Sequence, residues 1–251
     1  MTTAQTQPPL TGSPQPPPLH PQPAGLKGAA WKWGMGLLMC YVIYGAFFIA
    51  KNAIGFVGDS ARIIFFHVPC AVLSSIAYFV AAAYAGLYLF SSHPTKRFHL
   101  DLDAKAAAAM ELGFVFCILA TVTGSVFAGM QWGTFWNWDP REISIVGMLL
   151  LYAAYLVLRS AGGEQPDKRA RLTTVYILIT LIPTVFLIWV VPRIQALQSL
   201  HPTSVLANPK NTSAAYKEVL YPSFLAFILL FTWLFQLRFR LYKLANKVAS
   251  R

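Results

Sequence analysis

Residues 64–90 read IFFHVPCAVLSSIAYFVAAAYAGLYLF, an apolar run without a single Lys, Arg, Asp or Glu. A helix needs about 20 such residues to cross the hydrocarbon core of a bilayer. Since lipid offers no hydrogen-bond partners to the backbone, helices are the expected form. We predict an all-α integral membrane protein, a bundle of six transmembrane helices, because five further apolar stretches lie at about 33–50, 107–128, 143–159, 172–191 and 219–237.

The composition of the 251-residue chain supports this class. Hydrophobic residues make up 56% of the chain and charged residues 12%, about half the charged fraction of an ordinary soluble domain. The net charge is +11, but the basic residues lie between and after the apolar stretches, so no nucleic-acid partner is expected. The three cysteines are odd in number and far apart, which argues against a disulfide framework or a thiolate metal site.

The distribution of Lys and Arg predicts the orientation. Connecting segments on one side of the spans, with the chain ends, hold 14 basic residues, and those on the other side hold 6. Cytoplasmic segments are the richer ones in membrane proteins. We therefore expect both termini in the cytoplasm and three segments facing outward, at about 51–63, 129–142 and 192–218.

The two ends of the chain differ from the spans. Residues 1–28 are rich in Pro, Gln and Thr, a composition that predicts a disordered cytoplasmic tail. They lack the pattern of a cleaved secretory signal, so the first span is expected to be an uncleaved anchor. Residues 29–245 are predicted to form the six-helix membrane domain, and residues 246–251 a short basic cytoplasmic tail.

The second outward segment is rich in aromatic residues. Residues 131–142 read QWGTFWNWDPRE and hold three of the seven tryptophans. An aromatic belt at the membrane interface would scatter tryptophans over all helix ends, whereas these lie in one loop. We interpret the cluster as a stacking platform for a planar, mostly apolar ligand, made by Trp132, Phe135, Trp136 and Trp138.

The end of this segment has two interpretations. Asp139 and Pro140 have the residue types of an N-cap and of a first helical residue, which would make Asp139 structural. Arg141 could pair with Asp139 or with Glu142, or it could bind a ligand carboxylate through two hydrogen bonds. The sequence leaves contacts to the loop, to a ligand and to a partner open for Asp139 and Arg141.

Two histidines share the side of the tryptophan segment. His67, followed by Val68 and Pro69, lies at the outer end of the second span, and His201 lies in the third outward segment. Either histidine alone is more often an interfacial residue than a ligand. As a pair they suit the two axial positions of haem iron, with a neutral imidazole nitrogen as donor.

Three outward arginines are positioned to bind the haem propionates, namely Arg62, Arg141 and Arg193.

Inside the spans, Pro69 is expected to start or kink the second helix and free nearby carbonyls, and Pro183 to bend the fifth. Glu111 is expected to be structural, stabilised by the dipole at the start of the third span. The sequence has no C-x-x-C-H haem-attachment motif, no nucleophile with a base and no phosphate loop, so no enzyme is expected.

With these residues the chain resembles the haem exporter C family of cytochrome c maturation (CcmC), within the haem-handling protein superfamily. The resemblance covers about residues 30–245. The family's two histidines correspond to His67, in an H-V-P context, and to His201. Its W-G-x-x-W-x-W-D-x-R core is matched by Trp132, Gly133, Trp136, Trp138, Asp139 and Arg141, while departures stand at Phe135, Pro140 and Glu142.

The resemblance implies a non-enzymatic protein of the bacterial inner membrane. It would hold haem b transiently at the outer face, between His67 and His201, and pass it to a membrane haem chaperone (CcmE-like). Further implied partners are ABC-type subunits (CcmA-like and CcmB-like) and a small CcmD-like membrane protein. Whether the protein itself carries haem across the bilayer is left open.

Three other classes compete with this interpretation. A cytochrome c synthetase subunit of the same superfamily uses an additional histidine pair within membrane helices. A b-type haem electron-transfer protein holds its histidines inside facing helices, whereas both candidates here lie at outer edges. A small-molecule transporter would show interrupted helices, repeats and midplane charges, of which only Pro183 gives a hint.

Overall fold

The computed structural model describes residues 26–51, 56–163, 165–194, 199–201 and 213–249. Most of the predicted Pro-rich tail, residues 1–25, lies outside this part of the chain. No strand occurs among the described residues, which confirms the all-α class. The main helices are α1 (Leu26–Tyr44), α2 (Ile64–Phe90), α3 (Lys96–Trp132), α4 (Pro140–Ala161), α5 (Pro166–Ile179), α6 (Leu181–Val185) and α7 (Ala214–Ala249).

Shorter helical turns extend three of these helices. A π-helical turn, Gly45–Ile49, continues α1, and a 3-10 turn, Ser60–Ile63, precedes α2. After α6 come a π-helical turn, Phe186–Val190, and a 3-10 turn, Val191–Arg193. Within the described chain, five helical segments are long and apolar enough to cross a membrane, and the bent α5–α6 pair can supply a sixth.

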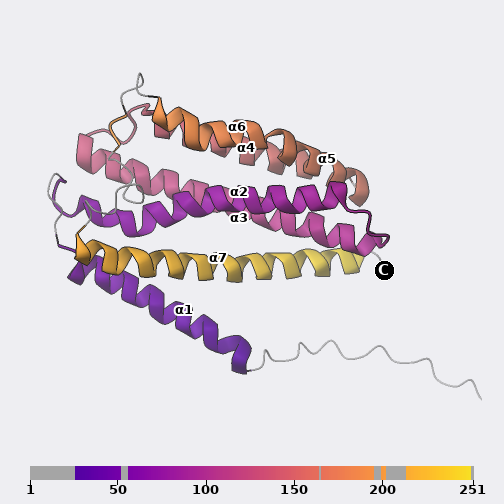
Figure 1. Ribbon diagram of the computed structural model, residues 1–251, viewed down its shortest axis with the longest axis horizontal. Helices are drawn as coiled ribbons and strands as arrows, with labels where there is room; N and C mark the ends of the chain where they lie inside the picture. The colour runs from indigo at the N-terminus through magenta and orange to yellow at the C-terminus, as the bar shows by residue number, and fades with distance from the viewer. Residues whose placement is uncertain (1–25, 52–55, 164, 195–198, 202–212, 250–251) are drawn as a thin grey trace, which may run out of the picture.

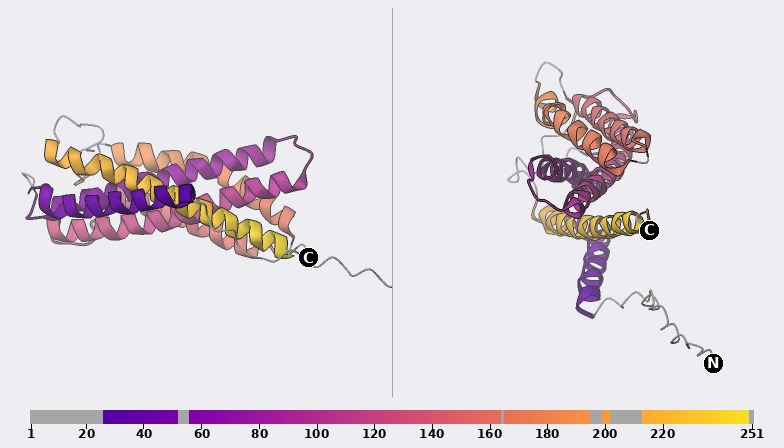
Figure 2. Two further views of the ribbon diagram at one scale, coloured as in Figure 1. Left: turned by 90° about the horizontal axis from the view of Figure 1, so that it is seen from below. Right: turned by 90° about the vertical axis from the view of Figure 1, so that its right-hand side faces the viewer.

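The helices form a layered bundle (Figures 1 and 2). The antiparallel helices α2 and α3 lie at its centre, with α4 and the α5–α6 pair on one side and α7 on the other. Helix α1 packs on α7 and diverges from it toward the N-terminus. Alanines allow α2 and α3 to approach closely, as small residues do between membrane helices, and Ala81, Ala85 and Ala109 are fully buried there.

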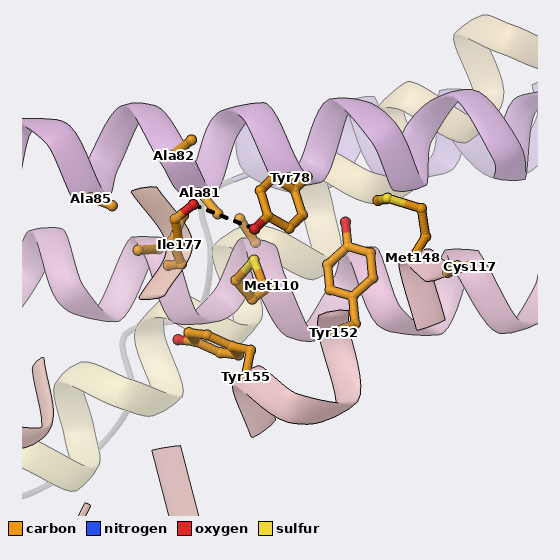
Figure 3. Close-up of a cluster of buried hydrophobic side chains, with 12 residues drawn as sticks. Tyr78, Ala81, Ala82, Ala85, Met110, Cys117, Met148, Tyr152, Tyr155 and Ile177 are labelled. Atoms are coloured by element: carbon orange, nitrogen blue, oxygen red, sulfur yellow. Dashed lines mark hydrogen bonds between the residues drawn. The ribbon is translucent and has the colours of Figure 1, made fainter. Parts of the chain in front are cut away.

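Three tyrosines fill the core between α2, α3 and α4 (Figure 3). Tyr78, Tyr152 and Tyr155 are completely buried. A buried hydroxyl requires a hydrogen-bond partner, and two of these hydroxyls find it on a neighbouring helix. Tyr152 donates to the Ser74 carbonyl at 2.6 Å, and Tyr78 donates to the Ile177 carbonyl at 3.4 Å. These bonds join α4 and α5 to α2.

Proline sites provide two further links between helices. Pro69 lies inside α2 and not at its start, and its missing N–H frees the carbonyl of Phe65, four residues earlier. The Ser223 hydroxyl of α7 donates to that carbonyl. Pro222 in α7 likewise frees the Glu218 carbonyl, which accepts a hydrogen bond from Tyr41 of α1 at 3.5 Å.

The bend predicted from Pro183 is confirmed. Helix α5 ends at Ile179, four positions before Pro183. In a continuous helix the ring of Pro183 would clash with the Ile179 carbonyl. Helix α6 starts at Leu181, and the two helices enclose a 41° bend. The Thr180 hydroxyl at the break is hydrogen-bonded to Tyr78.

Two helices are longer than the apolar stretches predict. Helix α3 begins at Lys96 instead of about residue 107, and α7 continues to Ala249, through most of the predicted basic tail. Hydropathy marks only the apolar part of a helix. The start of α3 is buried by its neighbours, with Ala104 and Ala107 inaccessible, whereas the end of α7 is largely exposed.

Because α3 starts at Lys96, the expectation that a helix dipole stabilises Glu111 was wrong. This residue lies far inside α3, away from the helix start, and pairs with Arg238 and Tyr242 of α7.

The same end of the bundle holds a buried ion pair. Arg159 of α4 donates to both carboxylate oxygens of Asp103 in α3, each at 2.9 Å, and both side chains are less than a tenth exposed. The guanidinium also lies 3.5 Å from the hydroxyls of Tyr155 and Thr173. Positive charge on this side was expected, but its burial between three helices was not.

We expect Arg159→Met to destabilise the bundle by about 3–5 kcal/mol, because it leaves the Asp103 carboxylate buried and unpaired. The free energy of unfolding in detergent measures this loss. The matched control is Lys243→Met, since the Lys243–Asp101 pair is 3.5 Å long and partly exposed and is worth at most about 1 kcal/mol. Equal losses in the two variants would contradict the expectation.

Candidate functional site

Three loop segments meet at the end of the bundle opposite the C-terminus (Figure 1). We call this the loop end, and it comprises residues 56–63, 133–139 and 191–201 where they are described. Gln131, at the end of α3, joins the first two segments. Its side-chain oxygen accepts hydrogen bonds from the Val57 N–H at 3.0 Å and from the Ser60 hydroxyl at 3.2 Å.

The loop between α3 and α4 is held by its own side chains. Gly133 ends α3 in the left-handed region, with φ 79°, a conformation that glycine adopts without steric cost. The Glu142 carboxylate accepts the backbone N–H groups of Asn137 and Asp139, at 2.8 and 3.2 Å. Trp138 also has a positive φ, 56°, which is rare for a bulky residue.

The four aromatic side chains of this loop differ in exposure. Phe135 and Trp138 are 68% and 70% exposed, whereas Trp132 and Trp136 are half-buried. The rings of Trp136 and Trp138 meet edge to face, with centroids 5.9 Å apart and planes at 88°. The aromatic cluster thus exists at the loop end, but these two rings do not lie in one plane.

Asp139 has the structural role that its residue type predicts. It is the N-cap of α4, and Pro140 is the first helical residue. Its carboxylate accepts the Arg141 backbone N–H at 2.9 Å, and with Glu142 it forms a capping box. The third loop segment adds two further donors to this carboxylate, the Ser199 hydroxyl and the Leu200 N–H. Sequence reasoning missed these contacts.

His67 lies in the first turn of α2 with its ring against α3. Its Nδ1 is 3.0 Å from the carbonyl oxygen of Ala120 and 3.1 Å from the Thr123 hydroxyl. Because a carbonyl oxygen can only accept, Nδ1 carries the proton and donates it to Ala120. The remaining nitrogen, Nε2, then has the lone pair that a metal ion requires.

Gly124 makes room for the His67 ring. A Cβ atom at Gly124 would lie 2.9 Å from Cε1 of His67, closer than real side chains approach. The available signal in the sequence was a glycine inside a helix, which costs roughly 0.5–1 kcal/mol relative to alanine unless packing demands it. Sequence reasoning considered neither Gly124 nor the Ala120 carbonyl.

The fold brings the two candidate histidines together. The ring centroids of His67 and His201 lie 6.4 Å apart, with planes inclined by 33°. Metal–imidazole bonds of about 2.0 Å on both sides, plus roughly 1 Å from each nitrogen to its ring centre, place two axial imidazoles about 6 Å apart. The observed separation matches the centre-to-centre distance of two imidazoles bound to one metal ion.

The three candidate arginines have different surroundings. Arg62 is paired with Asp59 at 3.1 Å, which neutralises its charge locally. Arg141 lies within electrostatic range of both His67 and Arg193. Its Nε atom is buried and finds no hydrogen-bond partner among the residues that the structure covers. Arg193 donates to the Trp189 carbonyl at 2.8 Å. Arg141 thus lies near His67, and Arg193 lies near Arg141.

The chain matches the family model described as heme exporter protein C over residues 24–251. It belongs to this family. The heme exporter protein C of Rhodobacter capsulatus is 34% identical over 199 residues, 77% of each chain, and that of Paracoccus denitrificans is 32% identical over 185 residues, 73% of each chain. A shorter similarity, 38% over 82 residues, links 33% of this chain to 26% of the cytochrome c biogenesis protein CcsA of Prochlorococcus marinus (strain MIT 9301).

Membership of the heme exporter protein C family confirms the resemblance found through the tryptophan motif and the two histidines. The two heme exporter relatives align over about three quarters of the chain, whereas the CcsA similarity is confined to a third of it. A member of this family with five to six apolar helices is an integral membrane protein.

We expect Gly124→Ala to displace the His67 ring, because the new methyl group would overlap it. Such overpacking costs typically about 1–3 kcal/mol, offset in part by the higher helix propensity of alanine. Nitrogen NMR of histidine-labelled protein measures the result, and the His67 signal should lose its Nδ1-protonated signature. Gly86→Ala is the control, since a Cβ there meets open space. An unchanged His67 signal in Gly124→Ala would contradict this expectation.

Proposed function

We propose that the protein binds haem b transiently at the loop end and delivers it to a membrane haem chaperone (CcmE-like) for cytochrome c maturation. The observation that carries the proposal is the 6.4 Å separation of the His67 and His201 rings in a chain of the heme exporter protein C family. Relatives from two bacteria carry the name heme exporter protein C. In this proposal haem is cargo, and the protein is not an enzyme.

The two histidines would bind the iron from opposite sides. His67 is prepared for this role, since its Nδ1–H is held by the Ala120 carbonyl and its Nε2 keeps a lone pair. A second-shell hydrogen bond of this kind orients a ligating imidazole and raises its basicity. His201 reaches His67 from a different loop segment, so the complete ligand pair exists only when the third segment is in place.

Arg141 and Arg193 would bind the two propionates. Arg141 lies within electrostatic range of the Asp139 carboxylate and of Arg193, so a propionate bound there would be attracted by two nearby cations. A guanidinium binds a carboxylate through two parallel hydrogen bonds. The Nε–H of Arg141 has no acceptor among the described residues and could donate one of them. Arg62 is the weaker candidate because Asp59 already binds it.

The aromatic side chains suit a site that must release its cargo. Trp138 and Phe135 expose about two thirds of their surface and would stack on the porphyrin, each contact worth roughly 0.5–1.5 kcal/mol beyond burial. Trp132 and Trp136 would support them from the half-buried side. An open edge of this kind leaves the porphyrin accessible to a chaperone, which a site buried inside the bundle would not.

The placement of the site follows from the charge distribution. The excess of Lys and Arg on the opposite side of the spans supports a loop end at the outer face of the bacterial inner membrane. ABC-type subunits (CcmA-like and CcmB-like) and a small CcmD-like protein complete the proposed assembly, in which the membrane helices offer apolar surface to partners and lipid.

We expect His67→Ala and His201→Ala each to lower haem retention more than about 10-fold, because one iron ligand is lost. The Soret absorbance of the purified full-length protein measures retention. His99→Ala is the matched control, since His99 contacts Ser91 and Tyr88 near the start of α3. A double His67→Ala, His201→Ala protein with full haem absorbance would disprove the proposal.

A pull-down separates delivery from permanent haem binding. Haem-loaded protein mixed with a chaperone of the CcmE type should lose its haem to that partner. A resident electron-transfer haem would instead stay bound stoichiometrically and become reduced by quinol. Retention of all haem in the presence of the chaperone would contradict the delivery function.

A further inference from the structure

The buried carboxylate of Asp139 makes more contacts than a helix cap needs. The residue is only 6% exposed. Oδ1 accepts the Arg141 N–H at 2.9 Å, which is the cap of α4. Oδ2 accepts the Leu200 N–H at 2.6 Å, and the Ser199 hydroxyl lies 2.9 Å from Oδ2 and 3.1 Å from Oδ1. Oδ1 thus caps the helix and also lies within hydrogen-bond distance of Ser199, while Oδ2 accepts hydrogen bonds from the third loop segment.

Ser199 extends these contacts to His201. The Ser199 hydroxyl donates its proton to Asp139, and its oxygen accepts the His201 backbone N–H at 3.2 Å. The backbone of His201 is therefore connected to the start of α4 through two consecutive hydrogen bonds. Hydrogen bonds to an ionised acceptor are the short and strong ones, and the helix N-terminus stabilises the negative charge of Asp139.

His67 and His201 are positioned by different means. His67 belongs to a long helix and packs against α3. His201 lies in a segment outside the helices, where backbone geometry alone does not set the ring. The position of the His201 ring relative to His67 thus depends on what joins its segment to the bundle, and in the described part of that segment these hydrogen bonds run to Asp139.

We propose that Asp139 is a positioning residue for His201: its Oδ2 fastens residues 199–201 to the start of α4 and so sets the second histidine against the first. This inference rests on the proposed haem site. Asp139 would then have two roles, to cap α4 and to position His201, and it would not contact haem directly.

The choice of aspartate can be tested because asparagine separates its two roles. Asn is as good an N-cap as Asp, so Asp139→Asn keeps an oxygen for the Arg141 N–H. Its NH2 group then replaces Oδ2 and faces the Leu200 N–H, where two donors oppose each other. The variant preserves the start of α4 and weakens the attachment of His201, because the Leu200 N–H loses its acceptor and Ser199 keeps only Oδ1, at 3.1 Å.

We expect Asp139→Asn to weaken haem binding by about 10- to 100-fold, the usual effect of losing a residue that orients a ligand. The visible spectrum of ferric haem in the purified full-length protein should shift from six-coordinate low-spin toward the spectrum of His201→Ala. Added imidazole should restore the low-spin spectrum in both variants, since it replaces the displaced ligand. The melting temperature of the haem-free protein should stay within a few degrees of the unmutated value.

Two further variants keep the inference falsifiable. Ser199→Ala removes the bridge to His201 and leaves the cap and the Leu200 bond intact, so a smaller shift of the same spectral kind is expected. Ser144→Ala, which removes a buried hydroxyl bound to the Pro140 carbonyl, is the control and should bind haem like the unmutated protein. If Asp139→Asn fails to fold, an unchanged spectrum and affinity in Ser199→Ala overturn the inference.

The outcomes distinguish this inference from the proposed function. A normal spectrum and affinity in Asp139→Asn, together with haem loss in His67→Ala and His201→Ala, overturn the positioning role and leave the proposed function standing. Unchanged haem binding in both histidine variants overturns the proposed function itself. Loss of binding in Asp139→Asn that imidazole does not reverse also counts against the positioning of His201.

Discussion

Backbone hydrogen bonds that a helix cannot make for itself govern this structure, because a bilayer supplies no water to make them. Pro69 leaves the Phe65 carbonyl without its helical donor, and Ser223 supplies one from α7. Pro222 leaves the Glu218 carbonyl open, and Tyr41 supplies a donor from α1. The breaks in the helices are thus also the places where helices are joined.

At the loop end, backbone N–H groups without a helical partner likewise bind groups elsewhere in the chain, and here the acceptors are side chains. The N–H groups of Asn137 and Asp139, before α4, donate to Glu142, and that of Arg141, in its first turn, donates to Asp139. Gln131 holds the first segment. Each of these polar side chains connects two stretches of backbone that would otherwise be independent. The resulting frame brings His67, Arg141 and His201 into one region while Trp138 remains exposed.

Much of this organisation could be predicted from local sequence. Apolar runs revealed most of the spans, Pro183 revealed the bend, and Asp139 with Pro140 revealed the start of α4. The start of α3 could not be predicted from hydropathy, because its polar and alanine-rich turns stay helical where neighbours bury them. The buried Arg159–Asp103 pair could not be predicted either, since its partners come from different helices.

The sequence by itself determined the class of the protein, its family and the residue types of the site, since hydropathy and a dense motif are local properties of the chain. Only the tertiary structure decided that His67 and His201 approach within 6.4 Å and that Ala120 holds the first ring. Such contacts join residues far apart in the chain, and no sequence spacing encodes those distances.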